Sequence, residues 1–221
     1  MELTPQQLKT NYDTIIAIIE ENISSPRKEK LIKFYDELSE HMMLAPASSL
    51  EHFHLAFTGG YCMHIKNVVD ASLLVAKAFK HMGGTINFTK EELVFTALNH
   101  DLGKVGDGKV PYYIPCQSDW HRKNQGKMFD VNPEITNMSV TDRSLYLLQK
   151  GGIDVSENEW IGIKCSDGMY DSSNEYYLRQ FSKEKQQKNN LVNIIHWADH
   201  MASRVEWDMG INDKLSGMFK S

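Results

Sequence analysis

The sequence predicts an all-α fold. Apolar residues recur at helical spacing through most of the 221-residue chain, and capping patterns open two of these segments. Only short pieces, such as residues 85–89 (TINFT), resemble strands. No internal repeat, low-complexity segment or convincing linker divides the chain, whose length fits one domain. We therefore expect a single domain over residues 1–221, with N-terminal helices in 1–58 packed on a helical core of 59–210.

The first predicted helix begins with a capping pattern. Thr4 is placed as its N-cap, Pro5 as its first helical residue, and Gln7 at the capping-box position. The apolar residues that follow fall on one helical face: Leu8, Tyr12, Ile15, Ile16 and Ile19. A second helix is expected after Pro26, and Pro46 with the serines that follow it marks a break.

The strongest helical pattern covers residues 61–82 and is ended by the Gly83–Gly84 pair. The next helix is expected to start at Thr89, where Glu92 has capping-box spacing, and to end near Gly103. Each of these two segments carries candidate metal ligands, so their boundaries matter for the site.

Residues 105–140 form the least regular segment, with three prolines and clustered aromatic residues. A loop of this length inside a compact domain is often functional, and we expect it to shape a substrate pocket. Helical pattern then returns in three segments: residues 140–152, 156–168 and 189–209.

Composition and charge restrict the function classes. Hydrophobic residues make up 41% and charged residues 24% of the chain, which are ordinary values for a globular protein. The net charge of −5 argues against a large duplex-DNA footprint, because phosphate neutralisation needs a basic face. No apolar run approaches the roughly 18 residues of a membrane span, and residues 1–12 show no signal pattern. Three scattered cysteines without a CxxC pair favour a reduced, cytoplasmic protein.

Four side chains have the types and placement of a metal site. His64 lies within the strongest predicted helix, His100 and Asp101 end the next one, and Asp199 lies within the apolar C-terminal helix. A charged aspartate on such a helix is costly if it is buried without a partner, and a metal ion removes that cost. Adjacent residues on a regular helix point about 100° apart, so His100 and Asp101 can converge only near a distorted helix end. Gly103 is placed to allow that distortion.

Ordinary structural explanations remain open for the same residues. The His100–Asp101 pair can be a helix C-terminus favoured by the macrodipole, and His64 can be a hydrogen-bonded core histidine. Asp199 can pair with Arg204 or a lysine. Two other sets of histidines are weaker ligand candidates: His196 with His200 at i, i+4, and His52 with His54.

The order of these residues resembles the HD superfamily of metal-dependent phosphohydrolases, roughly over residues 60–205. The stretch LNHDLGK is similar to the central motif of that superfamily, HWADHM to its final Ala-Asp element, and GGYCMHIKNVV to its first histidine element. The resemblance implies a helical bundle around one divalent cation, with Mn, Co, Ni, Fe, Zn and Mg as candidates. Its implied ligands are His64, His100, Asp101 and Asp199.

Many members of this superfamily bind a second metal through further histidines between the HD pair and the last aspartate. The corresponding stretches here, NMSVTDRSLYLL and IKCSDGMYD, contain no histidine. The resemblance therefore implies one metal ion, and it disfavours the di-iron oxygenases and the two-metal cyclic-dinucleotide phosphodiesterases. The nearer comparison is the mononuclear branch with its 5′-nucleotidases and deoxynucleotide triphosphohydrolases. The chain also resembles HD proteins of phages and mobile elements.

Several residues are candidates for contacts with a phosphorylated substrate. Lys104 and Lys109 flank a glycine-bearing loop, and the resemblance implies that Lys104 contacts the substrate phosphate. Asp167 is a candidate general acid, or a hydrogen-bond acceptor that positions a ligand. A pocket wall with one aromatic and several basic side chains is expected from Trp120, His121, Arg122 and Lys123. A solvated loop and a basic surface turn are the alternatives.

Together these observations predict a hydrolase that removes phosphate or polyphosphate from a small phosphorylated metabolite, with nucleotides favoured. Asp101, Lys104 and Asp167 are its predicted catalytic residues. Two alternatives stay open: a silent HD scaffold that binds a nucleotide or a protein, and an HD nuclease acting on single strands. Self-association into a homo-oligomer is an open expectation, and no membrane partner is expected.

Overall fold

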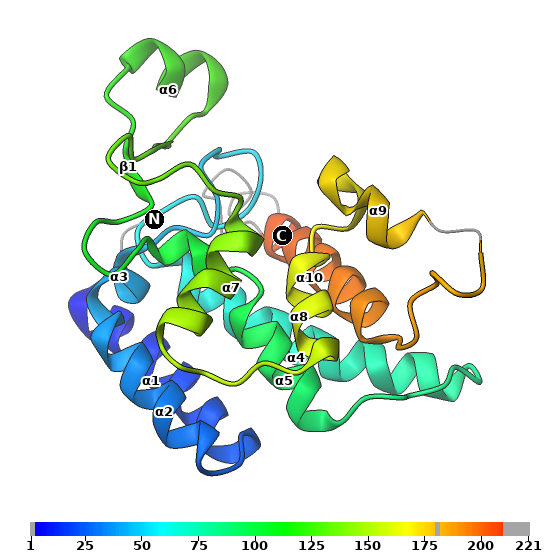
Figure 1. Cartoon of the computed structure of the whole chain (residues 1–221). Helices are drawn as coiled ribbons and strands as arrows, with labels where there is room; N and C mark the ends of the chain where they lie inside the picture. The colour runs from blue at the N-terminus through cyan, green and yellow to red at the C-terminus, as the bar shows by residue number, and fades with distance from the viewer. Residues whose placement is uncertain (1–2, 180–181, 210–221) are drawn as a thin grey trace, which may run out of the picture.

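The computed structural model describes residues 3–179 and 182–209, and the predicted core limit at residue 210 lies outside them. The described chain is mostly helical, with one small antiparallel sheet (Figure 1). Its α-helices are α1 (Pro5–Asn22), α2 (Arg27–Glu37), α3 (Ser39–Leu44), α4 (Gly60–His81), α5 (Lys90–Asn99), α6 (Asp119–Gln125), α7 (Val140–Lys150), α8 (Glu157–Lys164), α9 (Glu175–Leu178) and α10 (Leu191–Asp208). The remaining elements are the 3₁₀ turns η1 (Leu102–Val105), η2 (Gly168–Tyr170) and η3 (Ser172–Asn174), and the strands β1 (Tyr113–Pro115) and β2 (Phe129–Val131).

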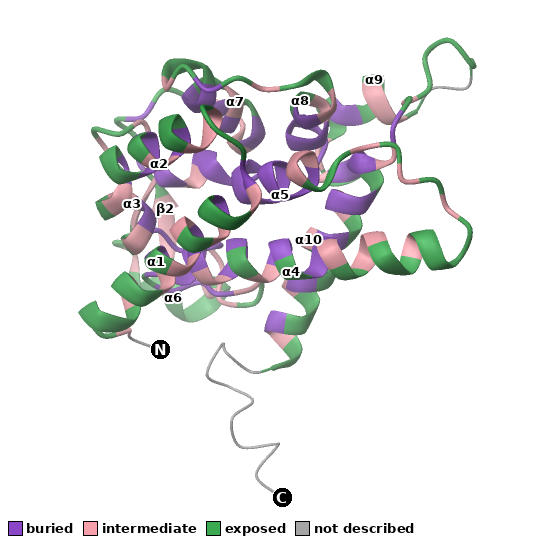
Figure 2. Cartoon of the chain, turned by 90° about the horizontal axis from the view of Figure 1, so that it is seen from below, coloured by how far each residue is buried: buried purple, intermediate pink, exposed green. Residues whose placement is uncertain are grey.

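The central layer consists of α4, α5 and α10, and these helices carry the candidate metal ligands. Helix α4 packs against both α5 and α10, while α8 covers α5 and α10 from another side (Figures 1 and 2). Helix α5 is apolar nearly all round, and its residues Leu93–Asn99 are all buried. None of the described helices is both long and apolar enough to cross a membrane. The fold thus holds the three helices with the candidate ligands in one largely buried layer.

The predicted helix starts are confirmed where a capping pattern supported them. Thr4 accepts a hydrogen bond from the Gln7 backbone amide, and Thr89 does the same for Glu92, with both capping boxes complete. A capping box that we did not predict opens α8, between Ser156 and Glu159. These local interactions satisfy amides that a helix N-terminus would otherwise leave unpaired.

The strand-like reading of residues 85–89 is wrong. This segment has no strand, and side chains rather than a ladder hold it: the Asn190 amide donates to Thr85 O, and Asn87 Nδ2 donates to Lys188 O. A ladder forms instead inside the predicted loop 105–140, where Ile114 pairs with Asp130 in the β1–β2 hairpin. Periodicity could not find strands of three residues, so the fold is mostly helical rather than all-α.

A partly buried cluster of ion pairs joins the N-terminal helices to the core. Arg27 on α2 places Nη1 2.8 Å from Glu159 on α8, and Nη2 2.6 Å from Glu91 at the start of α5. Its guanidinium also lies 4.3 Å from the centre of the Phe95 ring. The predicted N-terminal helices are therefore packed on the core through charged as well as apolar contacts.

Candidate metal centre

Four predicted ligands converge where α4, α5 and α10 meet. His64 Nε2 lies 3.1 Å from Asp199 Oδ1 and 3.6 Å from Asp101 Oδ2. His100 Nε2 lies 3.5 Å from Asp101 Oδ2 and 3.8 Å from Asp199 Oδ1. Residues that are far apart in the sequence thus present two imidazole nitrogens and two carboxylates to one point.

The end of α5 explains how two adjacent residues reach the same point. The helix ends at Asn99, and Asp101 already departs from helical geometry with φ −107° and ψ 11°. Gly103 has a different role from the one we predicted: a Cβ there would lie 2.1 Å from Val140 O at the start of α7. Glycine is needed for this close approach, and the distortion comes before it.

The Nδ1 atoms of both imidazoles, on the ring side away from Asp101 and Asp199, are held by other groups. These contacts fix the direction of the Nε2 atoms. His100 Nδ1 lies 2.8 Å from Ala97 O, and because a carbonyl only accepts, Nδ1 carries the proton. His64 Nδ1 lies 3.1 Å from Glu206 Oε2, and Asn67 Nδ2 donates to Glu206 Oε1 at 2.8 Å. Metal-binding histidines are commonly held this way, by a carboxylate or a carbonyl on the far side of the ring.

The surroundings of the two Nε2 atoms favour a metal ion at this point. His64 Nε2 and His100 Nε2 are both buried, and neither makes a hydrogen bond within the described part of the chain. The nearest carboxylate oxygens lie 3.1 Å from His64 Nε2, in Asp199, and 3.5 Å from His100 Nε2, in Asp101. Leaving two buried ring nitrogens unpaired is costly, and a cation among these four side chains would satisfy all of them. Two imidazoles and two carboxylates form a donor set that suits a divalent metal.

Charges around the centre keep both carboxylates ionised. Burial alone would raise the pKa of Asp199, but the charges of the nearby imidazoles and of the Lys104 ammonium hold it well below its ordinary value. Burial likewise opposes ionisation of Asp101, yet the Lys104 ammonium and the two histidines lower its pKa. Burial lowers the pKa of His64, and Glu206 and Asp199 outweigh this effect and raise it to about 10. Two ionised carboxylates that meet at one point attract a cation.

Lys104 lies directly beside the predicted ligands. Its Nζ donates to Asp101 Oδ2 at 2.6 Å and to Ala47 O at 2.7 Å. Burial would lower the pKa of Lys104, but Asp101 raises it above its ordinary value, so the ammonium stays charged. The predicted catalytic lysine is thus a partly buried cation at the edge of the candidate centre.

Asp167 faces the same cluster from the end of α8. Burial, followed by the negative charges of Asp101 and Asp199, raises the pKa of Asp167 to about 6. A carboxyl group with this pKa can give or take a proton near neutral pH. The acid–base role of Asp167 stays a prediction.

His54, one of the weaker ligand candidates in the sequence, lies next to the centre. Its ring centroid lies 4.6 Å from that of His64, and its Nε2 is buried without a hydrogen bond in the described residues. His54, His64 and Glu206 form a second group of potential ligand atoms, but His64 Nδ1 and Glu206 already engage each other. Burial and the positive charges of His64 and Lys104 lower the pKa of His54 to about 2. It therefore enters the centre as a neutral imidazole.

The remaining candidates lie elsewhere. Lys109 is exposed. The arm formed by the β1–β2 hairpin and α6 projects from the helical body, and four predicted contact residues are exposed at its tip (Figure 1): Trp120, His121, Arg122 and Lys123. The structure does not bring them to the metal ligands.

The alternative explanations can be tested against the geometry. Arg204 Nη2 lies 3.9 Å from Asp208 Oδ1, so the ion pair that it makes is not with Asp199. His196 Nδ1 lies 2.9 Å from Ser166 O, and His200 stacks on Tyr170. The two histidines are not among the groups of potential metal ligands found in residues 3–179 and 182–209.

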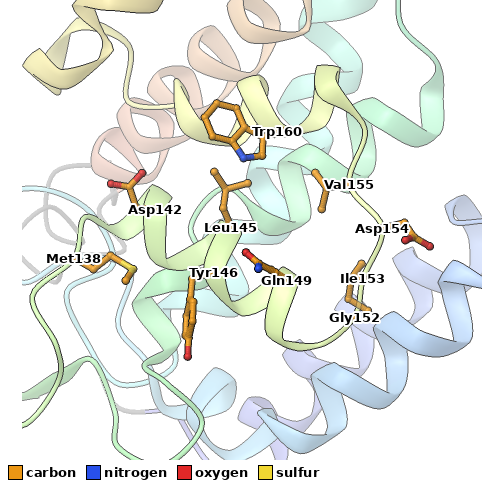
Figure 3. Close-up of a pocket in the computed structure, with 10 residues that line it drawn as sticks. All are labelled: Met138, Asp142, Leu145, Tyr146, Gln149, Gly152, Ile153, Asp154, Val155 and Trp160. Carbon is orange, nitrogen blue, oxygen red and sulfur yellow. The ribbon is translucent and has the colours of Figure 1, made fainter.

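Two of the cavities in the described part of the chain differ in their relation to the candidate metal centre. One of about 390 Å³ lies between α3, η1 and the β-hairpin, and Lys104 lines it. A second, of about 570 Å³, lies between α7 and α8 and is lined by Tyr146 and Trp160 among others; none of the predicted metal ligands lines it (Figure 3). The smaller cavity is therefore the one that shares a residue with the metal centre.

Glu206 is the main residue that the sequence reasoning missed. It lies seven residues after Asp199, so both fall on the same face of α10. A glutamate on the apolar face of that helix was a signal that could have been used, as the aspartate was.

Comparison with known proteins adds no relative: no family model, curated protein or solved structure matches the chain.

Proposed function

We propose that the chain is a mononuclear metal-dependent phosphohydrolase of the HD type, acting on a small phosphorylated metabolite of the nucleotide class. The observation that carries the proposal is the pair of Nε2 atoms of His64 and His100, which are buried and make no hydrogen bond within residues 3–179 and 182–209. Both lie beside the carboxylates of Asp101 and Asp199. The sequence order of these residues and the LNHDLGK motif supply the link to phosphate chemistry.

The residues of the site have separate roles in the proposed hydrolysis of a phosphate ester. His64, His100, Asp101 and Asp199 would hold one divalent cation. When bound, such a cation acidifies a water molecule and polarises a phosphoryl oxygen. Lys104 supplies a fixed positive charge beside Asp101, where it neutralises the charge of a substrate phosphate.

Asp167 supplies the proton in this proposal. Its raised pKa keeps a substantial protonated fraction near pH 6, and the protonated carboxyl can donate to the leaving oxygen. Glu206 acts through His64 as a positioning residue, because its carboxylate holds Nδ1 and leaves Nε2 directed at the centre.

A nuclease acting on single strands is the second candidate. One observation favours it: Trp120 is 60% exposed on the projecting arm, beside exposed Arg122 and Lys123. Aromatic and cationic side chains together bind single strands through stacking and phosphate contacts. Binding to an oligonucleotide that weakens steeply with salt and is lost in Trp120→Ala would favour the nuclease.

The phosphohydrolase is tested by a phosphate-release screen. Purified protein is loaded with Mn²⁺, Co²⁺, Ni²⁺ or Mg²⁺ and offered nucleoside mono-, di- and triphosphates. We expect turnover with at least one combination, and Asp101→Ala should lose both turnover and metal. The proposal fails if folded, metal-loaded protein releases no phosphate under any of these conditions.

A further inference from the structure

The cavity of about 390 Å³ shares one wall with the metal centre. Lys104 lines the cavity, and the ammonium of the same residue lies 2.6 Å from Asp101 Oδ2. A phosphate held at Lys104 would therefore have its organic part beside this cavity. The volume lies within the range of pockets that hold small molecules.

Two strands of the β-hairpin contribute aromatic side chains to the lining of the cavity. Tyr113 on β1 and Phe129 on β2 both line it, with ring centroids 6.3 Å apart. Both rings are only partly buried, although aromatic rings gain from full burial. Pro46, Pro111 and Pro115 add further apolar surface. Flat aromatic and proline surfaces suit a planar ring, whereas a sugar phosphate alone would leave these surfaces exposed to water.

Polar groups occur at one side of the same cavity. Glu40 and His41 on α3 line it, and His41 Nδ1 is buried without a hydrogen bond in the described part of the chain. An ionised carboxylate accepts hydrogen bonds only, so a ligand edge that meets Glu40 has to donate. Nucleobases combine a planar face with ring and amino N–H donors.

We infer that this cavity is the subsite for the organic part of the substrate, and that it takes a nucleobase against Tyr113 and Phe129. The inference rests on the proposed phosphohydrolase, whose phosphate position it uses. Specificity for the substrate base then comes from the β-hairpin and α3. The arm tip, where the sequence predicted the base-stacking residue, has no part in it.

The experiment compares substrates with and without a base. Phosphate release from nucleoside 5′-monophosphates and from ribose 5-phosphate is measured for the wild type, Phe129→Ala and Phe129→Leu. Val131→Ala, an exposed position on the same strand that does not line the cavity, is the control. We expect a nucleotide to exceed ribose 5-phosphate at least roughly tenfold in kcat/KM, and both Phe129 variants to lose most of that advantage. Val131→Ala should retain it.

Binding of a nucleoside without phosphate separates this inference from the proposed function. Calorimetry with adenosine and cytidine should show binding that Phe129→Leu weakens, whether or not the protein turns over phosphate esters. Equal kcat/KM for nucleotides and ribose 5-phosphate, unchanged in the Phe129 variants, would overturn the subsite and leave the phosphohydrolase standing. Absence of turnover together with Phe129-dependent nucleoside binding would remove the phosphohydrolase and keep the subsite. Nucleoside binding that Phe129→Leu does not weaken would also overturn the subsite.

Discussion

His64 Nδ1 lies 3.1 Å from Glu206 Oε2, and both side chains are almost completely buried. Burying a carboxylate is costly, and here the cost is offset by the imidazole and by a hydrogen bond from Asn67. The contact also leaves the opposite ring nitrogen, Nε2, directed at Asp101 and Asp199. Through this contact Glu206 positions His64 in the candidate metal centre.

Glu206→Gln should weaken metal binding. The amide keeps the shape and one acceptor but removes the negative charge that makes His64 a better ligand, so we expect a roughly 10–100-fold loss of affinity. Calorimetric titration of the metal-free protein with Mn²⁺ or Ni²⁺ measures the metal affinity of the variant and of the wild type. Asp208→Asn, which removes an exposed charge from the same helix, is the matched control. Equal affinity in the two variants would show that Glu206 has no role at the centre.

Lys104→Met should separate metal binding from catalysis. The ammonium shares Asp101 with the proposed cation, and like charges repel, so its removal should tighten metal binding roughly tenfold. Turnover should fall in the same variant, because the charge that neutralises the phosphate is lost. Lys9→Met, an exposed lysine on α1, controls for the change in net charge. Weaker metal binding in Lys104→Met would contradict this account.

Asp167→Asn should change the pH dependence of stability. The pKa of Asp167 is raised from 3.8 to about 6, so its ionised form disfavours folding. This cost is absent below about pH 4, grows as the pH rises through 6, and is complete above it. The metal-free variant should therefore melt at a higher temperature than the wild type at pH 8, and the difference should shrink towards pH 4. A difference in Tm that is the same at every pH would contradict the raised pKa.

Gly103→Ala should destabilise the fold and the centre together. The added methyl group would lie 2.1 Å from Val140 O, so α7 has to move, at a cost of about 1–3 kcal/mol. The move also disturbs Ser144, whose hydroxyl accepts from the Gly103 amide and donates to His100 O. Urea unfolding measures the first effect and metal titration the second. Gly83→Ala has open space at its Cβ, so it should leave metal affinity unchanged while costing stability through its φ of +94°.

Much of the helical frame could be read from the sequence because its signals are local. The capping boxes at Thr4 and Thr89 predicted where α1 and α5 begin. The apolar run around His64 covered almost the whole of α4. The four candidate ligands could be listed together only because their order resembles a known superfamily. Their actual approach depends on how α4 and α10 pack, and that is a non-local property.

Other features could not be read, for physical reasons. The β1–β2 strands have three residues each, too few for an alternating pattern to stand out. The aromatic residue expected at the pocket, Trp120, lies on the exposed arm tip, while Tyr113 and Phe129 line the cavity beside Lys104. Sequence proximity to a basic cluster favoured Trp120, but strand pairing decided which rings turn inward.

The central claim is that four side chains hold one divalent cation, and anomalous X-ray diffraction from crystals grown with Mn²⁺ tests it most directly. We expect one anomalous peak per chain, about 2.0–2.3 Å from His64 Nε2, His100 Nε2 and oxygens of Asp101 and Asp199. Absence of a peak at saturating Mn²⁺, or a peak bound by other side chains such as His196 and His200, would contradict the account.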